Sequence, residues 1–379
     1  MGLSRAEAYT RWGIIREIEP LTESAYNFFE WIEQQKPNIG EAVDTPWHVS
    51  FHGSQFPGDD PYACPRASLY RMMDIPRMPP SRQLRGEAEA GKDIEDRIVL
   101  KYYLAGYLLS DPPPPFGKHQ MQFEDPKHWL TSTVDSVVIH PNESRGKVVE
   151  IKSKKAEVID QMQKLCRGPD PKHVIQLKCQ IGLAHEQGTW QVRRCYNTGR
   201  LAVKLGLSDV DQSDNNKPAK IKTTVVEVCP EHGTAKCLRE VELEPVERGF
   251  LKYVSRDDPS DTWEFMYEYD PDFMAIGRKQ LALWREWWLE GVLPQTNFSD
   301  KRFSHPLNWT WTKSKSCPDS PCEWCDYGDI CREDHKSSVK LGKPISLADS
   351  AGIGVAEEIR QGYSIDLVRM AVERRWNGR

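Results

Sequence analysis

The chain has 379 residues, a length that fits one large domain or two ordinary ones. Its hydrophobic fraction of 39%, with 13 Trp and 13 Tyr, supplies enough apolar side chains for a substantial core and excludes a globally disordered protein. The formal net charge of −5 gives no support for nucleic-acid binding, although a nuclease can bind phosphates through a local basic channel and bridging metal ions while its remaining surface stays acidic.

The N-terminal residues give no sign of export or of a membrane anchor. Residues 1–20 alternate charged and apolar residues, so we do not expect a signal peptide, and no apolar run reaches the roughly 18 residues that a membrane span needs. Ten cysteines in such a chain are expected to be thiols or metal ligands rather than disulfides. These features predict a cytoplasmic protein without membrane association.

The hydrophobic pattern predicts helices and strands that alternate along the chain. Helices with apolar residues three or four positions apart are expected at 22–35, 82–109, 171–187 and 263–293. Strands rich in β-branched residues are expected at 129–140, 147–151 and within 189–244, with a mobile loop at 211–220. One or two short helices are expected in the last 40 residues. This order predicts an α/β core with a metal-bound extension assembled from distant parts of the chain.

The strand pair that precedes the 171–187 helix carries side chains suited to phosphodiester hydrolysis. Asp135 lies within the first strand, while Glu150 and Lys152 lie two positions apart near the end of the second and so project from the same face. Two carboxylates and the main-chain carbonyl of Ile151 are hard oxygen ligands that suit Mg²⁺ or Mn²⁺. The lysine can orient or deprotonate an attacking water and stabilise charge that develops on the phosphate.

An isolated Glu-x-Lys pair is usually a solvated pair at a strand end, so the prediction depends on its surroundings. An aspartate within an apolar strand is costly unless it is exposed or liganded. The helix before the strand pair supplies a further carboxylate, Glu95, and the helix after it carries Gln176, whose amide can contact phosphate or water. From the residues alone, Glu95 can equally be an ordinary helix-surface acid, and a solvated glutamine is the favoured interpretation of Gln176.

The order of these motifs resembles the RecB-like branch of the PD-(D/E)XK nucleases. The motifs are a helix with Gly91 and Glu95, the Asp135 strand, the strand with Glu150 and Lys152, and a helix with Gln176. The resemblance implies an α/β fold with a restriction-endonuclease-like core, a central mixed sheet flanked by helices, and catalytic roles for Asp135, Glu150 and Lys152. The first motif of this branch usually holds His rather than Glu95, and Gln180 stands where the branch usually has Tyr.

Cysteines toward the C-terminus form a second chemical signature. Cys322, Cys325 and Cys331 have C-x2-C-x5-C spacing, which allows three thiolates to surround one soft metal centre. A complete site needs a fourth ligand. The residues alone allow either Cys317, which would give a local zinc knot, or the distant Cys64.

The RecB-like nucleases with an iron–sulfur cluster, including the CRISPR-associated (Cas-four type) exonuclease family, have one cysteine before the nuclease motifs and three with this spacing after them. The resemblance therefore implies a structural 4Fe–4S cluster bound by Cys64, Cys322, Cys325 and Cys331. The expected organisation is a helical entry segment at 1–60, a nuclease core at 61–296, a cluster segment at 297–335 and an appendage at 336–379.

A further group of metal-ligand types, Cys229, His232 and Cys237, lies between two expected strands. These three soft ligands could hold zinc, but unpaired cysteines in a β-hairpin are the favoured interpretation. The remaining cysteines, Cys166, Cys179 and Cys195, are expected to be buried thiols.

Basic and aromatic residues bear on the substrate. The candidates for phosphate binding are Lys147, Lys152, Lys154, Lys155, Arg193 and Arg194. The Trp-rich helix, with Trp284, Trp287 and Trp288, offers either stacking faces for unpaired bases or core packing, and core packing is favoured.

Together these patterns predict a metal-dependent DNA exonuclease, and the resemblance favours single-stranded DNA cleaved from 5′ to 3′. The alternatives are a structure-specific endonuclease that uses the same site and a non-catalytic DNA-binding scaffold with a structural four-cysteine metal knot. No P-loop pattern occurs, so the chain is not expected to be a helicase by itself. A helicase, a recombination complex or a CRISPR-adaptation complex is an expected partner.

Overall fold

The computed structural model of the protein describes residues 50–58, 63–75, 82–110, 120–165, 168–211, 220–294, 325–359 and 362–377. The helix predicted at 22–35 lies outside the described residues, as do residues 212–219 of the predicted mobile loop.

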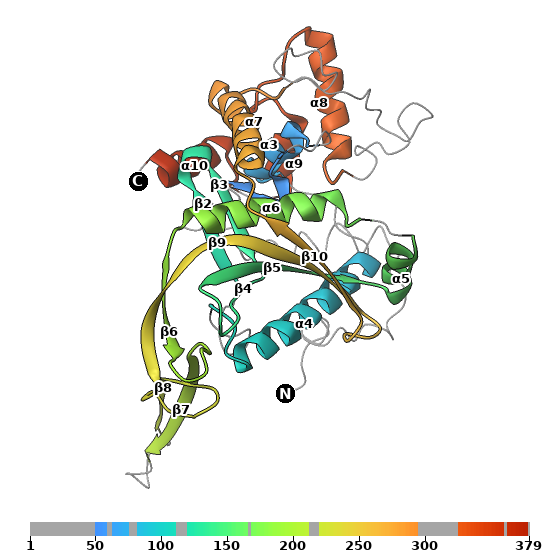
Figure 1. The fold of residues 1–379 in the computed structure, drawn as a ribbon. Helices are drawn as coiled ribbons and strands as arrows, with labels where there is room; N and C mark the ends of the chain where they lie inside the picture. Colours follow the sequence, from blue (N-terminus) through green and yellow to red (C-terminus); the bar gives the residue numbers. More distant parts are fainter. Residues whose placement is uncertain are drawn as a thin grey trace, which may run out of the picture.

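A central mixed sheet organises the fold, with strand order β10-β9-β5-β4 (Figure 1). Its strands are β4 (Ser136–Val138), β5 (Arg145–Lys154), β9 (Leu238–Ser255) and β10 (Thr262–Glu268). The β4–β5 and β9–β10 pairs are antiparallel, whereas β5 and β9 run parallel. The long strand β9 pairs through its first part with β6 (Trp190–Cys195) and through its later part with β5. The expected mixed α/β architecture is therefore present.

Two smaller strand groups flank this sheet. A three-stranded sheet has the order β1-β3-β2, formed by β1 (Phe51–His52), β3 (Leu130–Val134) and β2 (Met121–Asp125). An antiparallel hairpin of β7 (Val203–Asp211) and β8 (Lys220–Val228) projects from the body of the molecule beyond β6 and the start of β9 (Figure 1). The hairpin therefore forms an arm whose base lies against the central fold.

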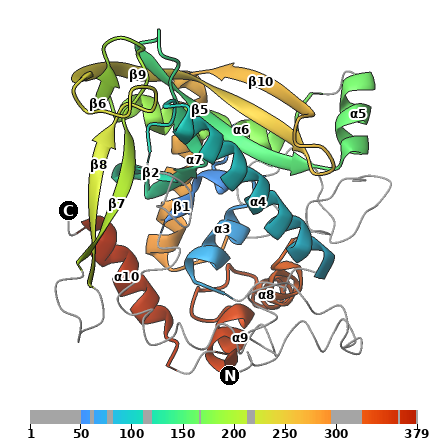
Figure 2. The same ribbon diagram turned by 90° about the horizontal axis from the view of Figure 1, so that it is seen from below.

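Helices cover both faces of the central sheet. Figures 1 and 2 show α4 (Arg82–Leu104) along one face and α6 (Pro171–Glu186) on the other. A short helix, α5 (Ala156–Lys164), follows β5. On the side of the three-stranded sheet lie α3 (Pro65–Met72), α7 (Pro271–Glu290), α8 (Gly328–Leu341), α9 (Ala351–Ile359) and α10 (Ile365–Asn377).

Local sequence explains where α6 and α7 begin. Each starts with proline at its first position, where the missing N–H costs nothing, and each is preceded by an aspartate, Asp170 or Asp270, whose carboxylate accepts a main-chain N–H of the first turn. Helix α7 ends at Gly291, which has φ of 70° and closes the helix with a left-handed residue.

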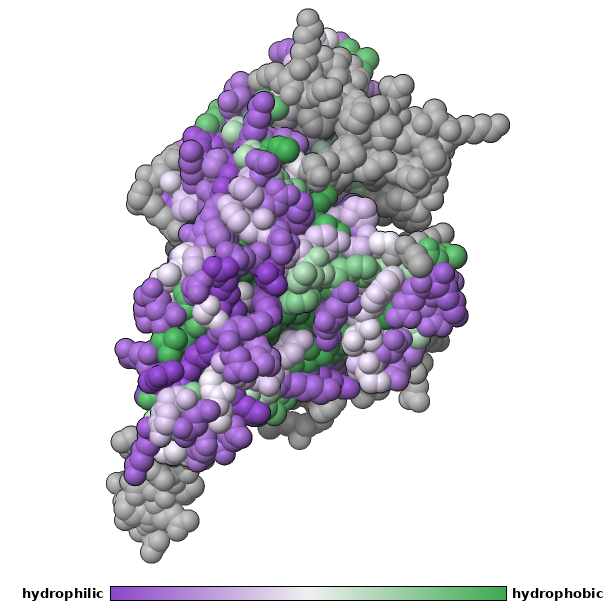
Figure 3. Space-filling model, viewed as in Figure 1, coloured by the Kyte–Doolittle hydropathy of each residue, from purple (hydrophilic) through white to green (hydrophobic). Residues whose placement is uncertain are grey.

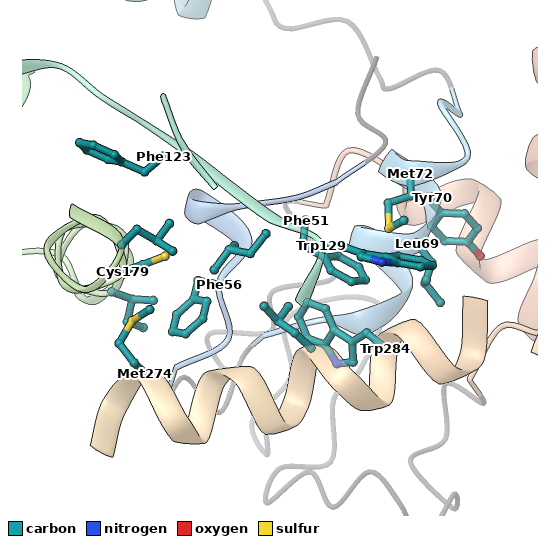
Figure 4. Packing of buried hydrophobic residues seen from close by; sticks show 14 of the residues in the cluster. Phe51, Phe56, Leu69, Tyr70, Met72, Phe123, Trp129, Cys179, Met274 and Trp284 are labelled. Carbon is teal, nitrogen blue, oxygen red and sulfur yellow. The ribbon is translucent and has the colours of Figure 1, made fainter. Parts of the chain in front are cut away.

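The main hydrophobic core lies between α6, α7 and the three-stranded sheet (Figure 4). Trp284, Trp287 and Trp288 are fully buried there, and the Trp284 ring packs edge-on against Phe51 with centroids 5.7 Å apart. Core packing, and not base stacking, is therefore the role of these tryptophans. Trp376 of α10 belongs to the same cluster.

Three sequence-based boundaries were wrong. The helix expected at 263–293 is two elements, since β10 occupies Thr262–Glu268 and α7 begins only at Pro271, after the Asp270 cap. Trp263, Phe265 and Tyr267 alternate with polar residues and Met266, a period of two that fits a strand.

The other two errors concern α4 and the strand with Asp135. Helix α4 ends at Leu104 instead of 109, shortly before Gly106, which has φ of 70°. Asp135 does not lie inside one continuous strand but at the break between β3 and β4, which belong to different sheets.

Hydrophilic residues cover most of the described surface in the view of Figure 3. Among the described residues, no helix combines the length and apolar character that crossing a membrane requires.

Candidate functional site

The break between β3 and β4 places Asp135 beside the end of β5. Ser136 pairs with Val149, so Asp135 lies next to Glu150 and Ile151 across the strand pair. The main-chain N–H of Ile151 donates a 2.7 Å hydrogen bond to Asp135 Oδ2. This bond fixes one carboxylate oxygen and leaves the other available for a ligand.

Glu150 and Lys152 lie on the face of β5 that is turned toward α6. Their neighbours Val149 and Ile151 pack with Ile94 of α4 on the opposite face, as the two-residue period of a strand requires. Glu150 is fully buried, and Lys152 Nζ lies 2.5 Å from Glu150 Oε1. A lysine this close to a buried carboxylate forms a charge-assisted contact, which is stronger than a hydrogen bond between neutral groups.

Glu95 approaches this group from α4. Its negative charge acts on Asp135, Glu150 and Lys152, and its Oε1 accepts a 3.1 Å hydrogen bond from Gln120 Nε2. Gly91, one turn earlier on α4, allows the close approach, because a Cβ there would lie 2.9 Å from Ser153 Oγ of β5.

The amide that contacts the carboxylates belongs to Gln180 and not to Gln176. Gln180 is fully buried on α6, and its Nε2 donates to Glu150 Oε2 at 2.6 Å and to the Thr133 carbonyl at 2.9 Å. Gln176 is half-buried one turn earlier. The sequence did point to position 180, which lies one helical turn after Gln176. The resembled family usually has Tyr at this position, so the role of Gln180 was left open.

Two acids of this group carry perturbed proton affinities. Burial first, and then the charges of Glu150 and Glu95, hold the pKa of Asp135 well above its ordinary value. Burial also raises the pKa of Glu150, although Lys152 and Gln180 oppose the shift. Burial by itself would lower the pKa of Lys152. The negative charges of Glu150 and Asp135 have the larger effect, so the pKa of Lys152 is raised. A group of acids that repel one another in this way favours a bound cation.

A basic rim, formed by Lys154 and Lys172, lies near Lys152 and His173. Lys154 and Lys172 lie close enough to His173 to affect its protonation, and Lys152 does so too. Burial, together with these lysines, lowers the pKa of His173 to about 4, so its imidazole is neutral at pH 7. His173 Nδ1 lies 2.9 Å from the hydroxyl of Tyr253. These groups can bind a phosphate next to the carboxylates.

Three of the other predicted phosphate-binding residues are engaged elsewhere. Lys147 pairs with Glu143 at 2.5 Å and Arg193 pairs with Glu227 at 3.0 Å, while Lys155 is exposed before α5. Arg194 is buried and donates to four main-chain carbonyls, those of His140, Pro141, Glu143 and Gly199. Arg194 therefore holds loops together and is not a phosphate ligand.

The donor set at the carboxylates fits a hard divalent cation. Asp135, Glu150 and Glu95 offer carboxylate oxygens from three elements, although the ligand atoms of the three do not all lie within 4.8 Å of one another in the described structure. Gln180 Oε1 is buried and accepts no hydrogen bond from the described part of the chain. Oxygen-rich sites of this kind suit Mg²⁺ or Mn²⁺ and not a soft metal.

The cysteines predicted to bind an iron–sulfur cluster lie partly outside the described residues. Cys317 and Cys322 are outside, as is Cys166. Cys64 precedes α3 and Cys331 lies in α8. Arg66 connects these two helices, because it is buried and its Nη1 lies 3.4 Å from both the carbonyl oxygen and the Sγ of Cys331.

The remaining member of that set, Cys325, lies near the basic rim. Burial raises the pKa of its thiol, and the charge of Lys172, at the start of α6, partly opposes this shift. Cys325 therefore lies near the start of α6.

A second group of ligands was only partly found from the sequence. Cys229, His232 and Cys237 are joined by Cys195, which was predicted to be an ordinary buried thiol, and one ligand atom of each lies within 4.8 Å of the others. Such a Cys3His group can bind a metal ion. Cys179, by contrast, is buried in α6 as predicted.

Replacement of Gln180 tests its role as support for Glu150. Gln180→Ala removes the donor to Glu150 and to the Thr133 carbonyl, and we expect the free energy of unfolding to fall by about 1–3 kcal/mol because both acceptors stay buried. The matched Gln176→Ala change on the same helix should alter it by less than about 0.5 kcal/mol. Urea denaturation measures both, and equal losses would contradict this role.

Two solved structures show a distant likeness to this chain. One is the crystal structure of an alkaline exonuclease (LHK-Exo) from Laribacter hongkongensis, with a TM-score of 0.35 and 12% identity over 66% of this chain and 93% of that chain. The other is LHK-Exo in complex with dAMP, with a TM-score of 0.34 and 10% identity over 65% and 93% of the two chains. No protein-family model and no curated protein matches the sequence.

Proposed function

We propose that this protein is a metal-dependent DNA nuclease of the PD-(D/E)XK type that hydrolyses phosphodiester bonds. One observation carries the proposal: the buried Glu150 is ion-paired with Lys152 at 2.5 Å beside Asp135 and Glu95. A single lysine offsets only part of the negative charge of three neighbouring acids, so a bound metal ion would neutralise the rest.

In this proposal each residue has a distinct role. Asp135, Glu150, Glu95 and the main-chain carbonyl of Ile151 would hold Mg²⁺ or Mn²⁺, which when bound polarises the phosphate and activates water. Lys152 orients the attacking water and stabilises charge on the phosphate. Gln180 positions Glu150, and Gln176 is kept as a candidate contact to phosphate or water.

The proposed substrate is single-stranded DNA, which the protein would degrade as an exonuclease from 5′ to 3′. Both the substrate and the polarity rest on the sequence resemblance. The basic rim of Lys154 and Lys172 supports a phosphate-bearing substrate at this site. A structure-specific endonuclease with the same residues is the second enzymatic candidate, and a non-catalytic DNA-binding scaffold is the candidate from another class. We place the protein in the cytoplasm, serving a helicase, a recombination complex or a CRISPR-adaptation complex.

We also propose a structural 4Fe–4S cluster on Cys64, Cys322, Cys325 and Cys331. The Arg66 contact between the first turn of α3 and Cys331 supports it, since an arginine beside the thiols compensates the negative charge of a thiolate-bound cluster. Iron and acid-labile sulfide analysis of protein purified without oxygen tests this assignment.

Digestion of labelled DNA tests the proposed activity. Linear single-stranded DNA with a 5′ label, incubated with Mg²⁺ or Mn²⁺, should be degraded, and omission of the metal should stop the reaction. Closed circular single strands should survive if the enzyme is an exonuclease, whereas their cleavage would favour the endonuclease. Binding of DNA without any cleavage under all metal conditions would favour the scaffold.

A further inference from the structure

A group of soft ligands lies far from the carboxylates, where β6, β8 and β9 meet. Cys195 ends β6, Cys229 follows β8, and Cys237 immediately precedes β9. His232 lies in the turn between Cys229 and Cys237. The three cysteines are buried and the histidine is exposed at the edge of the group, so the site has an opening to solvent.

The distances among these atoms match those around one tetrahedral ion. His232 Nδ1 lies 3.2 Å from the Sγ of Cys229, 3.5 Å from that of Cys195 and 3.6 Å from that of Cys237. A tetrahedral Zn²⁺ with Zn–S bonds of about 2.3 Å and a Zn–N bond of about 2.0 Å separates nitrogen from sulfur by about 3.5 Å. Hydrogen bonding does not account for this convergence, because one imidazole nitrogen has a single hydrogen or lone pair to share among three sulfurs.

Ordinary core packing does not account for the cysteines either. They form a cluster separate from the main core, and a single partly buried side chain, Leu238, packs against it among the described residues. Three thiols with so few apolar neighbours bury little hydrophobic surface, which is the usual reason for burying a cysteine.

The main chain around the ligands forms a tight, preorganised turn. The Gly233 N–H donates to the Cys229 carbonyl at 2.9 Å, and the Cys229 N–H donates to the Thr234 carbonyl at 3.0 Å. Gly233 has φ of 62°, a conformation that favours glycine. On the other side, the Tyr196 N–H donates to the Cys237 carbonyl at 2.9 Å, which joins the ends of β6 and β9.

We propose that Cys195, Cys229, His232 and Cys237 bind one structural Zn²⁺ ion that fixes the base of the β7–β8 arm. Four protein ligands, which complete a tetrahedron, are typical of structural zinc, and three sulfurs with one nitrogen favour Zn²⁺ over Mg²⁺ or Ca²⁺. Val203 and Val228 form the strand pair at the base of the arm, and Cys229 directly follows Val228. An ion bound to Cys229 therefore ties the arm to β6 and β9.

Metal analysis of the purified full-length protein tests the site. After removal of any affinity tag, we expect about one zinc ion per chain. Cys229→Ser and His232→Ala should each lower the zinc content at least about fivefold, and His232 is exposed, so its replacement should leave the central fold outside the arm intact. Cys179→Ala, a buried cysteine of α6, is the matched control and should keep its zinc.

Iron measured in the same samples separates this site from the proposed cluster, since both variants should leave iron unchanged. Co²⁺ in place of Zn²⁺ should give the intense visible bands of a tetrahedral thiolate site in wild type, and these bands should be lost in Cys229→Ser. Zinc well below one ion per chain, zinc that persists in both variants, or iron that falls with it would overturn the proposal.

Limited proteolysis tests the structural role. Removal of zinc, by chelation or by His232→Ala, should expose new cleavage sites near the ligands, within residues 196–211 or 220–236, while the Cys179→Ala control stays protected there. Unchanged protection of this segment in protein shown to lack zinc would contradict a role in holding the arm.

Discussion

Replacing Lys152 with alanine is expected to reduce Mg²⁺-dependent DNA cleavage by about 10²–10⁴-fold, the usual contribution of a positioned acid–base or charge-stabilising group. Lys152 Nζ lies 2.5 Å from the buried Glu150, so the variant loses an ammonium at the point where charge would develop on the phosphate. Initial rates on 5′-labelled single-stranded DNA, at saturating DNA, measure the effect.

Lys147→Ala is the matched control for this experiment. Lys147 lies on the same strand and also pairs with a glutamate, Glu143, at 2.5 Å, but at the far end of β5. Its replacement should change the rate of DNA cleavage by less than about twofold relative to the wild type. A partly exposed ion pair contributes little to stability, so the variant should stay folded. Wild-type activity in Lys152→Ala would mean that the active site has been placed wrongly.

A Mg²⁺ titration separates two ways in which Lys152 could act. Without the lysine, the buried Glu150 loses its partner and holds a proton more tightly, which would weaken metal binding. A rate restored by high Mg²⁺ would assign the lysine to maintaining the metal site. A rate that stays low at saturating Mg²⁺ is expected if Lys152 acts on the water or the phosphate.

The parts of the site that the sequence predicted are those that depend on local period. Glu150 and Lys152 share a face of β5 because they are two residues apart in a strand, and the tryptophans of α7 are buried because their spacing is that of one helix face. The strand Thr262–Glu268 was missed for the complementary reason, since its two-residue alternation was merged with the helix that follows.

The parts that were missed depend on contacts between residues distant in sequence. Cys195 is 37 residues from His232, and only the pairing of β6 with β9 brings the two together. Gln180 contacts Glu150 because α6 packs across β5, which fixes the turn of the helix that faces the acid. Local spacing carries no information on which helix turn meets which strand position.

Replacing Asp135 with asparagine is expected to abolish cleavage and, at the same time, to stabilise the metal-free protein. Burial and the nearby Glu150 and Glu95 raise the pKa of Asp135 well above its ordinary value of 3.8. An acid whose pKa is raised by folding contributes stability at low pH and loses it as the pH rises through the raised value. Asparagine keeps an oxygen for the Ile151 N–H and removes the repulsion.

The gain should therefore be negligible near pH 3.5 and grow as the pH rises above 3.8, because the folded wild-type protein disfavours the charged form of Asp135. Urea denaturation should be compared in buffer without added Mg²⁺, because a chelator would also compete for the Cys3His group. Added Mg²⁺ should then stabilise the wild type and not Asp135→Asn, since only the wild type keeps the Asp135 carboxylate for the ion. A variant less stable than wild type at pH 8 would show that the Asp135 charge is balanced by the protein itself, and the carboxylates would then have no need of a metal ion.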